Sequence, residues 1–125
     1  MEIFDMEKYE KITKYTVNRQ WGIYIWGTIH EVAMGFPEIP NEADKEHYTQ
    51  FYTLLFKVLP CPICKDDFTS IEQLYPIDLT DRASLFKWTV DIHNAVNKKL
   101  NGFVWTVDEA LKQWSSTYYE LLLKH

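Results

Sequence analysis

Apolar residues recur every three or four positions through most of the chain, in long segments separated by short stretches that contain Pro or Gly. This spacing places side chains on one face of an α-helix. The first such segment predicts a helix over about residues 17–34. The second begins after Asn41, a good helix cap with Asp44 three residues on, and ends before Pro60, which cannot continue a helix. The expected stripe of the first helix consists of Trp21, Ile25, Thr28, Ile29 and Val32.

Three more helices follow from the same pattern. Pro62 fits the first turn of a third helix that runs to about residue 74. Thr80 is the expected cap of a fourth helix that ends near Leu100, and Thr106 and Glu109 form a capping-box pattern before a fifth. No stretch alternates like a β-strand bounded by hairpin turns. We therefore predict an all-α fold, a four-helix bundle with a short fifth helix.

The 125 residues suit a single domain, with a core over about residues 17–124 and an N-terminal extension over 1–16. A composition of 46% hydrophobic and 25% charged residues is typical of a globular protein. The net charge of −5 argues against nucleic-acid binding. No apolar run approaches the roughly 20 residues of a membrane helix, and the charged start lacks the apolar core of a signal peptide. We expect a cytoplasmic protein.

Aromatic residues are unusually frequent, with 5 Trp, 8 Tyr and 7 Phe. Aromatic side chains bury large areas and present flat faces. The composition fits an aromatic core, a subunit interface or a site for a flat ligand, and leaves all three open.

Cys61 and Cys64 form a Cys-Pro-Ile-Cys motif at a predicted helix N-terminus, where the helix dipole favours thiolate over thiol. A bridge closing so small a loop is a poor structural staple but suits redox exchange. A zinc site would need further ligands, for which His30 and His93 are candidates. A thioredoxin-like protein would place the motif after a strand, whereas a helix precedes it here. A redox dithiol is the favoured interpretation.

Two polar groups on the predicted helices suggest a ligand. On the first helix, Gly22, Trp26 and His30 are spaced at i, i+4 and i+8 and share one face. A glycine there lets a flat ring or a phosphate approach the backbone. The alternative is that Trp26 belongs to the core and that His30 is a hydrogen-bonded core histidine.

On the fourth helix, His93 and Asn97 lie one turn apart, with Asn94 beside them and Lys98 and Lys99 following. Amides offer paired donors and acceptors for a heterocycle, and lysines near a helix end suit a phosphate or the helix dipole alone. Asn is unfavourable inside a helix, and such a local cost is typical of functional sites. A solvated polar face is the alternative.

Taken together, these motifs resemble the ERV/ALR family of FAD-dependent sulfhydryl oxidases. The resemblance covers about residues 20–115 and includes the late Trp114, fourteen residues after Leu100. It implies a four-helix bundle with a short fifth helix that binds FAD within the bundle. The matching elements are Trp21-Gly22, Trp26 and His30, then Cys61-Pro62-Ile63-Cys64, and then Trp88, His93-Asn94, Val96, Asn97 and Leu100.

The resemblance also implies roles for individual residues. Cys64 would lie next to the isoalloxazine, and Cys61 would face the incoming thiol. The implied cofactor-binding residues are Gly22, Trp26, His30, His93, Asn94 and Asn97, with Trp114 near the adenine and Lys98 or Lys99 at the pyrophosphate.

The chain departs from the family pattern at two positions. Many members have a basic residue where this chain has Ile23, and a lysine where it has Gly102. We therefore expect the phosphate contacts to be redistributed to Lys98, Lys99 or Arg82.

The implied activity is disulfide formation in a client protein. A client thiolate would attack Cys61 of the Cys61–Cys64 disulfide, and two electrons would pass through Cys64 to FAD and then to oxygen, producing hydrogen peroxide. Because the chain has no further cysteines, the expected partner is a separate thioredoxin-like or small dithiol protein. The resemblance further implies a homodimer. The single domain resembles the small versions of large DNA viruses, which would place it in host cytoplasm or virion.

Two alternatives of other classes stay open at this point. One is a non-enzymatic helical interaction module in which Cys61 and Cys64 form a structural bridge. The other is a zinc-stabilised helical domain that uses Cys61, Cys64, His30 and His93.

Overall fold

The computed structural model describes residues 5–8, 21–59, 62–99 and 102–114. Within these ranges, all regular secondary structure is helical. The all-α prediction is therefore confirmed. None of the described helices is both long and apolar enough to cross a membrane. The helices are α2 (Trp21–Ala33), α3 (Glu42–Lys57), α4 (Pro62–Leu74), α5 (Arg82–Lys99) and α6 (Val107–Trp114).

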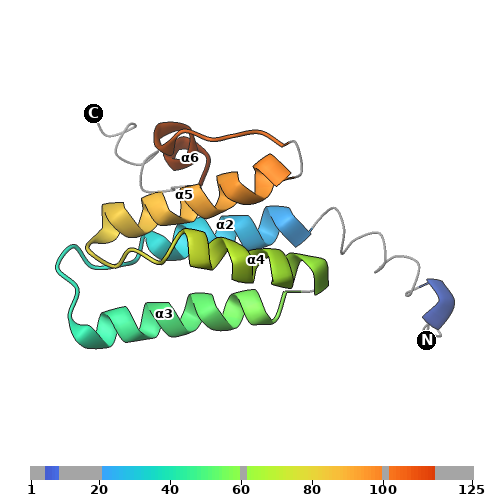
Figure 1. Ribbon diagram of the computed structural model, residues 1–125, viewed down its shortest axis with the longest axis horizontal. Coiled ribbons are helices and arrows are strands. Elements are labelled where there is room, and N and C mark those ends of the chain that lie inside the picture. The colour runs from blue at the N-terminus through green and yellow to red at the C-terminus, as the bar shows by residue number, and fades with distance from the viewer. Residues whose placement is uncertain (1–4, 9–20, 60–61, 100–101, 115–125) are drawn as a thin grey trace.

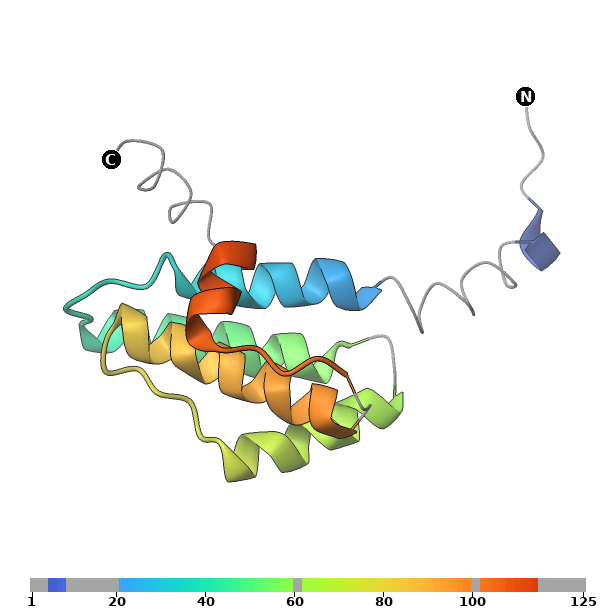
Figure 2. The same cartoon turned by 90° about the horizontal axis from the view of Figure 1, so that it is seen from above.

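The four longer helices form a bundle in which α5 packs against both α2 and α4, and α3 packs against α4 (Figure 1). The short α6 runs across α2 and α5 and contacts both (Figure 2). Helix α5 thus packs against α2, α4 and α6. Any side chain on its inner face lies within reach of α2, α4 or α6, which is where a site built from several helices has to form.

Local capping explains two of the helix starts. The Asn41 side chain accepts a hydrogen bond from the Asp44 backbone N–H at 2.8 Å, and the Asp44 carboxylate accepts one from the Asn41 N–H at 2.9 Å. Thr106 and Glu109 make the same reciprocal pair at 3.1 Å in both directions. Both pairs are capping boxes and confirm the predicted starts of α3 and α6.

The predicted cap of α5 is wrong by one residue. Asp81, not Thr80, accepts the hydrogen bond from the backbone N–H of Ser84 at 2.8 Å. That bond lowers the pKa of the Asp81 carboxyl. Thr80 instead donates its hydroxyl to Asp78 at 2.7 Å within the preceding loop. Thr80 and Asp81 are both residue types that cap helices. The Asp81 carboxylate is the stronger hydrogen-bond acceptor because it is charged.

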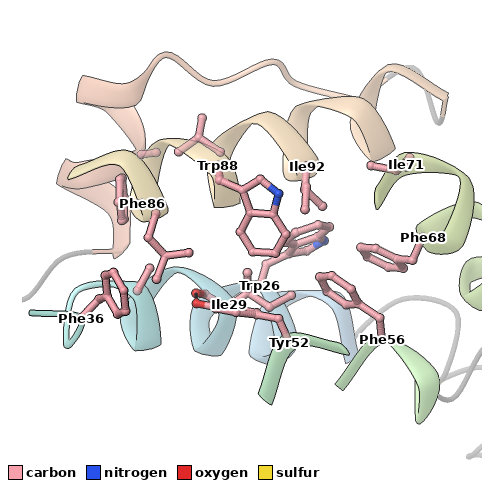
Figure 3. Packing of buried hydrophobic residues seen from close by; sticks show 14 of the residues in the cluster. Trp26, Ile29, Phe36, Tyr52, Phe56, Phe68, Ile71, Phe86, Trp88 and Ile92 are labelled. Atoms are coloured by element: carbon pink, nitrogen blue, oxygen red, sulfur yellow. Dashed lines mark hydrogen bonds between the residues drawn. The ribbon is translucent and has the colours of Figure 1, made fainter. Parts of the chain in front are cut away.

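Aromatic rings from different helices fill the core. Figure 3 shows Phe56 of α3 and Phe68 of α4 side by side, with Trp26 of α2 next to them. The Phe56 and Phe68 rings stack with centroids 4.6 Å apart, and Phe68 lies 5.6 Å from Trp26. Tyr52 and Trp88 meet edge to face at 5.0 Å. Each such ring buries roughly 150–250 Å² on folding, which makes this cluster the main apolar contribution to stability.

The buried face of α2 differs from the predicted stripe. From Tyr24 to its end, the buried side chains of α2 are Trp26, Ile29, His30 and Ala33. Thr28 is exposed and donates its hydroxyl to the Tyr24 carbonyl of its own helix, so its place in the stripe is wrong. The inner face of α2 is thus the face that carries Trp26 and His30, because partners on α5 make burial of a histidine favourable.

Tyr52 joins α3 to α2 by donating its hydroxyl to the Ile29 carbonyl at 2.8 Å. Burial raises the pKa of this phenol. We expect Tyr52→Phe to lower the free energy of unfolding by about 1 kcal/mol, because it removes one buried hydrogen bond and little else. Urea denaturation followed by circular dichroism measures the change. The matched control is Tyr24→Phe, the same substitution at a side chain 73% exposed, which we expect to be neutral. Equal effects of the two substitutions would contradict this role of Tyr52.

Candidate functional site

Five flat side chains from three helices and one loop meet where α2, α5 and α6 converge. Trp26 and His30 come from α2, and both are buried, at 8% and 0% exposure. His93 comes from the inner face of α5, Trp105 from the loop that follows α5, and Trp114 from the end of α6. We call these five residues the aromatic–histidine cluster.

Ring stacking holds the cluster together. Trp26 and His93 are almost parallel, with centroids 4.0 Å apart and an angle of 8° between the rings. His30 and Trp114 stack at 4.4 Å, and Trp105 meets Trp114 edge to face at the same separation. A separation of 4.0 Å is direct contact, so no third ring fits between Trp26 and His93. A flat ligand at this site has to contact the outer faces of the cluster or part the stack.

The two histidines are joined by hydrogen bonds inside the bundle. His30 Nε2 lies 2.8 Å from His93 Nδ1, and His30 Nδ1 lies 2.8 Å from Thr89 Oγ1. Burial and then the neighbouring His93 ring lower the pKa of His30 to about 3. Burial lowers the pKa of His93 to about 4. Both rings are therefore neutral at pH 7, and the site carries nitrogen donors and acceptors without positive charge.

The Asn94 side chain fixes the loop that carries Trp105. Its Nδ2 donates to the Trp105 carbonyl at 2.7 Å, and its Oδ1 accepts from the Trp105 N–H at 2.7 Å. This two-point contact places Trp105 against the cluster. Sequence reasoning singled out Asn94 but missed Trp105. The available signal was a large aromatic residue just before the Thr106 capping box.

Asn97 ties down the same loop, one turn farther along α5. Its Nδ2 donates to the Phe103 carbonyl at 2.7 Å, and its backbone carbonyl accepts from the Gly102 N–H at 2.6 Å. A Cβ at position 102 would lie 3.3 Å from the Asn97 Cβ, so the close approach of the loop favours glycine there. The two asparagines that suggested ligand contacts thus also build the wall of the site.

The basic residues expected at a phosphate lie at opposite ends of α5. Lys98 and Lys99 occupy its last turn, just beyond Asn97. Arg82 occupies its first turn, about 24 Å away along the helix axis. There the Arg82 Nε donates to the Phe36 carbonyl at 2.6 Å, and its guanidinium pairs with Glu38 at 3.2 Å. Arg82 therefore holds the loop after α2, which speaks against a shared role with the two lysines.

For the remaining predicted site residues, the structure describes only the position in a helix, or the residue lies outside the described ranges. Gly22 lies in the first turn of α2, one turn before Trp26, as predicted. Cys64 lies in the first turn of α4, which begins at Pro62 as the sequence predicts. Cys61 lies outside the described residues. Position 64 is four residues before Phe68, so the two positions share one face of α4, and Phe68 packs against Trp26.

The zinc alternative is not supported by the histidine geometry. Both ring nitrogens of His30 are engaged, one with Thr89 and one with His93. A metal ligand needs a nitrogen lone pair that is not already used. Within the described ranges, no group of three or more His, Cys, Asp or Glu side chains is placed to hold a metal ion.

A helical bundle in which the Cys-x-x-Cys helix packs, through Phe68, against a cluster of stacked rings is the arrangement expected of a helical redox protein. Comparison with known proteins agrees with this class. The model of the Erv1 / Alr family matches residues 24–115. This match covers most of the chain, which therefore belongs to the Erv1 / Alr family, as the sequence motifs predict.

Individual relatives support the same assignment. A probable FAD-linked sulfhydryl oxidase of Acanthamoeba polyphaga mimivirus is 40% identical over 101 residues, covering 78% of this chain and 71% of the relative. The mitochondrial FAD-linked sulfhydryl oxidase ERV1 of Saccharomyces cerevisiae is 29% identical over 101 residues. That match covers 81% of this chain but 53% of the yeast protein, so the chain spans about half of the cellular relative's length.

A solved structure shares the fold that surrounds the site. The crystal structure of the FAD binding domain of Erv1 from Saccharomyces cerevisiae superposes with a TM-score of 0.72 at 29% identity. It covers 77% of this chain and 91% of that domain. The shared fold confirms the predicted helical bundle of this family.

The two buried histidines predict a pH-dependent stability. In the unfolded chain each has a pKa near 6.5, whereas in the folded protein the values fall to about 3 for His30 and about 4 for His93. Unfolding therefore takes up protons below pH 6.5. We expect the free energy of unfolding to be highest above that pH and to decrease as the pH falls from 7 to 5. The slope approaches about 1.4 kcal/mol per pH unit for each histidine.

Urea titrations of the ligand-free protein at several pH values measure this slope. His93→Gln removes one of the two titrating rings and should roughly halve it. A free energy of unfolding that stays constant between pH 7 and pH 5 would show that the histidines are not buried in the neutral form.

Proposed function

We propose that this protein is a FAD-dependent thiol oxidase that generates disulfide bonds in a client protein, with Cys61 and Cys64 as its redox pair. The relatives support the activity, since they are named as FAD-linked sulfhydryl oxidases. The match to a FAD binding domain supports the cofactor. The non-enzymatic interaction module is not favoured by these relatives.

The observation that carries the proposal is the contact between the Cys-x-x-Cys helix and the aromatic–histidine cluster. Phe68, one turn after Cys64, packs against Trp26 with centroids 5.6 Å apart, and Trp26 in turn stacks on His93. The first turn of α4 is therefore held next to the helix face that carries the cluster. Electron transfer between a dithiol and a flavin needs this proximity.

The residues of the site fit FAD in their chemistry. FAD has two flat heterocycles joined through a ribityl chain and a pyrophosphate. The ring faces of Trp26, Trp105 and Trp114 suit the heterocycles, since aromatic rings stack face to face or offset. His93, Asn94 and Asn97 supply neutral hydrogen-bonding groups around the same face. Lys98 and Lys99 follow at the end of α5 and supply positive charge for the pyrophosphate.

The cysteine pair carries the thiol chemistry. A client thiolate attacks the Sγ of Cys61, the Cys61–Cys64 bond breaks, and Cys64 leaves as a thiolate. A second client thiolate then attacks the client sulfur of the mixed disulfide, which releases the oxidised client and leaves both cysteines reduced. The dipole at the start of α4 would stabilise a thiolate at position 64. Cys64 would therefore serve as the leaving group and, with FAD bound, as the thiolate that passes electrons to it.

Bound FAD supplies the two-electron acceptor that the protein lacks, and dioxygen takes the electrons onward as hydrogen peroxide. The two cysteines lose two electrons and two protons in forming their bridge again, so each turnover oxidises one dithiol and reduces one dioxygen. The chain contributes position and exclusion of water: Trp26 and His93 are less than a tenth exposed.

We further propose that the thiol donor is a thioredoxin-like or small dithiol protein, because the chain has only the Cys61–Cys64 pair to receive its electrons. A homodimer is supported by exposed apolar side chains, namely Tyr24 on α2, Leu54 on α3 and Val58 just after α3. The mimivirus relative, of which this chain covers 71%, supports a viral setting in host cytoplasm or the virion.

The direct test is the visible absorption of the purified protein before and after anaerobic dithiothreitol. We expect a flavin spectrum that bleaches with the dithiol and returns in air. Cys64→Ser should bind FAD equally, as shown by the same absorbance before reduction, but should lose rapid bleaching because the electron path is cut. A colourless protein that FAD cannot reconstitute would refute the proposal, and so would rapid bleaching of the serine variant.

The lysines at the end of α5 give a second test. Lys98→Gln and Lys99→Gln should each weaken FAD binding several-fold, since each removes a charge from the pyrophosphate end of the site. Lys87→Gln is the matched control, because Lys87 lies on the same helix and pairs with Asp91 at 2.9 Å away from the cluster. Titration of the ligand-free protein with FAD, followed by tryptophan fluorescence, measures the affinities. Equal effects at positions 87, 98 and 99 would remove the lysines from the site.

A further inference from the structure

Thr89 lies on the inner face of α5, one turn before His93, and is fully buried. It belongs to no group of residues that the sequence suggested for ligand binding. Its hydroxyl nevertheless makes two short contacts. Oγ1 lies 2.6 Å from the Phe86 carbonyl oxygen and 2.8 Å from His30 Nδ1.

These distances fix the position of each proton. A carbonyl has no proton, so the 2.6 Å contact requires the Thr89 hydroxyl to donate to Phe86. The hydroxyl has then no second proton to give, and the contact with His30 requires His30 Nδ1–H to donate to Oγ1. Threonine often donates in this way to a carbonyl of the preceding turn of its own helix. Toward His30, the Thr89 hydroxyl oxygen can then act only as an acceptor.

The same reasoning extends to His93. A neutral His30 that carries its proton on Nδ1 has a lone pair on Nε2. The 2.8 Å contact between His30 Nε2 and His93 Nδ1 then requires the proton of His93 to lie on Nδ1. His30 is fully buried, which disfavours the doubly protonated cation that could reverse this bond. His93 Nε2, on the side of the ring away from His30, is left with a lone pair.

We propose that Thr89 is a positioning residue that, through His30, fixes His93 in the form whose Nε2 accepts a hydrogen bond. The site thereby selects a ligand group that donates an N–H or O–H at this point, and FAD carries such donors on its adenine, its hydroxyl groups and its ring system. This inference rests on the proposed function for the identity of the ligand, while the chain of hydrogen bonds exists without it.

Removal of the hydroxyl should release the histidines from this form. In Thr89→Val, which keeps the shape of the side chain, His30 Nδ1–H has no acceptor. The His30 tautomer with its proton on Nε2 becomes more stable, because this N–H can donate to His93 Nδ1. His93 then carries its own proton on Nε2. The acceptor at the site becomes a donor. Thr89→Ser keeps the hydroxyl and is the matched control.

Two measurements test the proposal. Long-range ¹H–¹⁵N NMR spectra of the histidine rings in the ligand-free protein distinguish the Nδ1–H from the Nε2–H form. We expect both His30 and His93 as Nδ1–H in the wild type and in Thr89→Ser, and the Nε2–H form in Thr89→Val. We expect the FAD dissociation constant to rise about tenfold in Thr89→Val, the loss of roughly one hydrogen bond, and to change less than about twofold in Thr89→Ser.

A wild-type His93 in the Nε2–H form would overturn the proposal, as would a Thr89→Val protein with unchanged histidine forms and unchanged FAD affinity. Thr89→Ser behaving like Thr89→Val would reduce Thr89 to a packing residue. If Thr89→Val does not fold, Thr89→Ala replaces it, since alanine also lacks the hydroxyl. A protein that binds no FAD would refute the proposed function, but the ligand-free spectra would still decide the arrangement of protons.

Discussion

The contact between α2 and α5 through two neutral histidines is the constraint on which the rest of the structure depends. His30 is completely buried and lies 2.8 Å from both Thr89 and His93. Without hydrogen-bond partners, the desolvation of the ring nitrogens of a buried imidazole would cost more free energy than the burial of the ring contributes. The hydrogen bonds therefore fix which faces of α2 and α5 meet. The same contact turns the flat ring of His93 toward Trp26, and so sets the first stack of the aromatic–histidine cluster.

Other elements of the site are arranged around this contact. Asn94 holds Trp105 by two hydrogen bonds at 2.7 Å, and the Thr106 capping box then starts α6, which brings Trp114 onto His30. On the other side, Phe68 connects the Cys-x-x-Cys helix to Trp26. In the proposed oxidase the polar residues thus have a double role: they build the walls of the site and present the groups that a flavin nucleotide meets.

Sequence reasoning predicted what depends on neighbours in the chain. The capping boxes at Asn41 and Thr106 and the start of α4 at Pro62 are local, and the structure has them where the pattern predicts. The inner face of α2 was predicted in part: Ile29 is buried and Ile25 and Val32 pack against the core. The burial of His30 beside them depends on partners 59 and 63 residues away. Trp105 and the hydrogen-bonding role of Thr89 were missed for the same reason, since both depend on contacts between segments and have no local pattern. The Erv1 / Alr motifs predict further site positions, because these motifs combine distant segments of the chain.

We propose that the aromatic–histidine cluster, and not another face of the bundle, binds FAD. The most direct test is a titration of the ligand-free protein with FAD, followed by NMR of the histidine ring C–H groups. We expect large shifts at His30 and His93 and none at His47, which lies exposed on α3. Shifts at His47 with unchanged His30 and His93 signals, in a protein whose absorbance shows bound flavin, would contradict it.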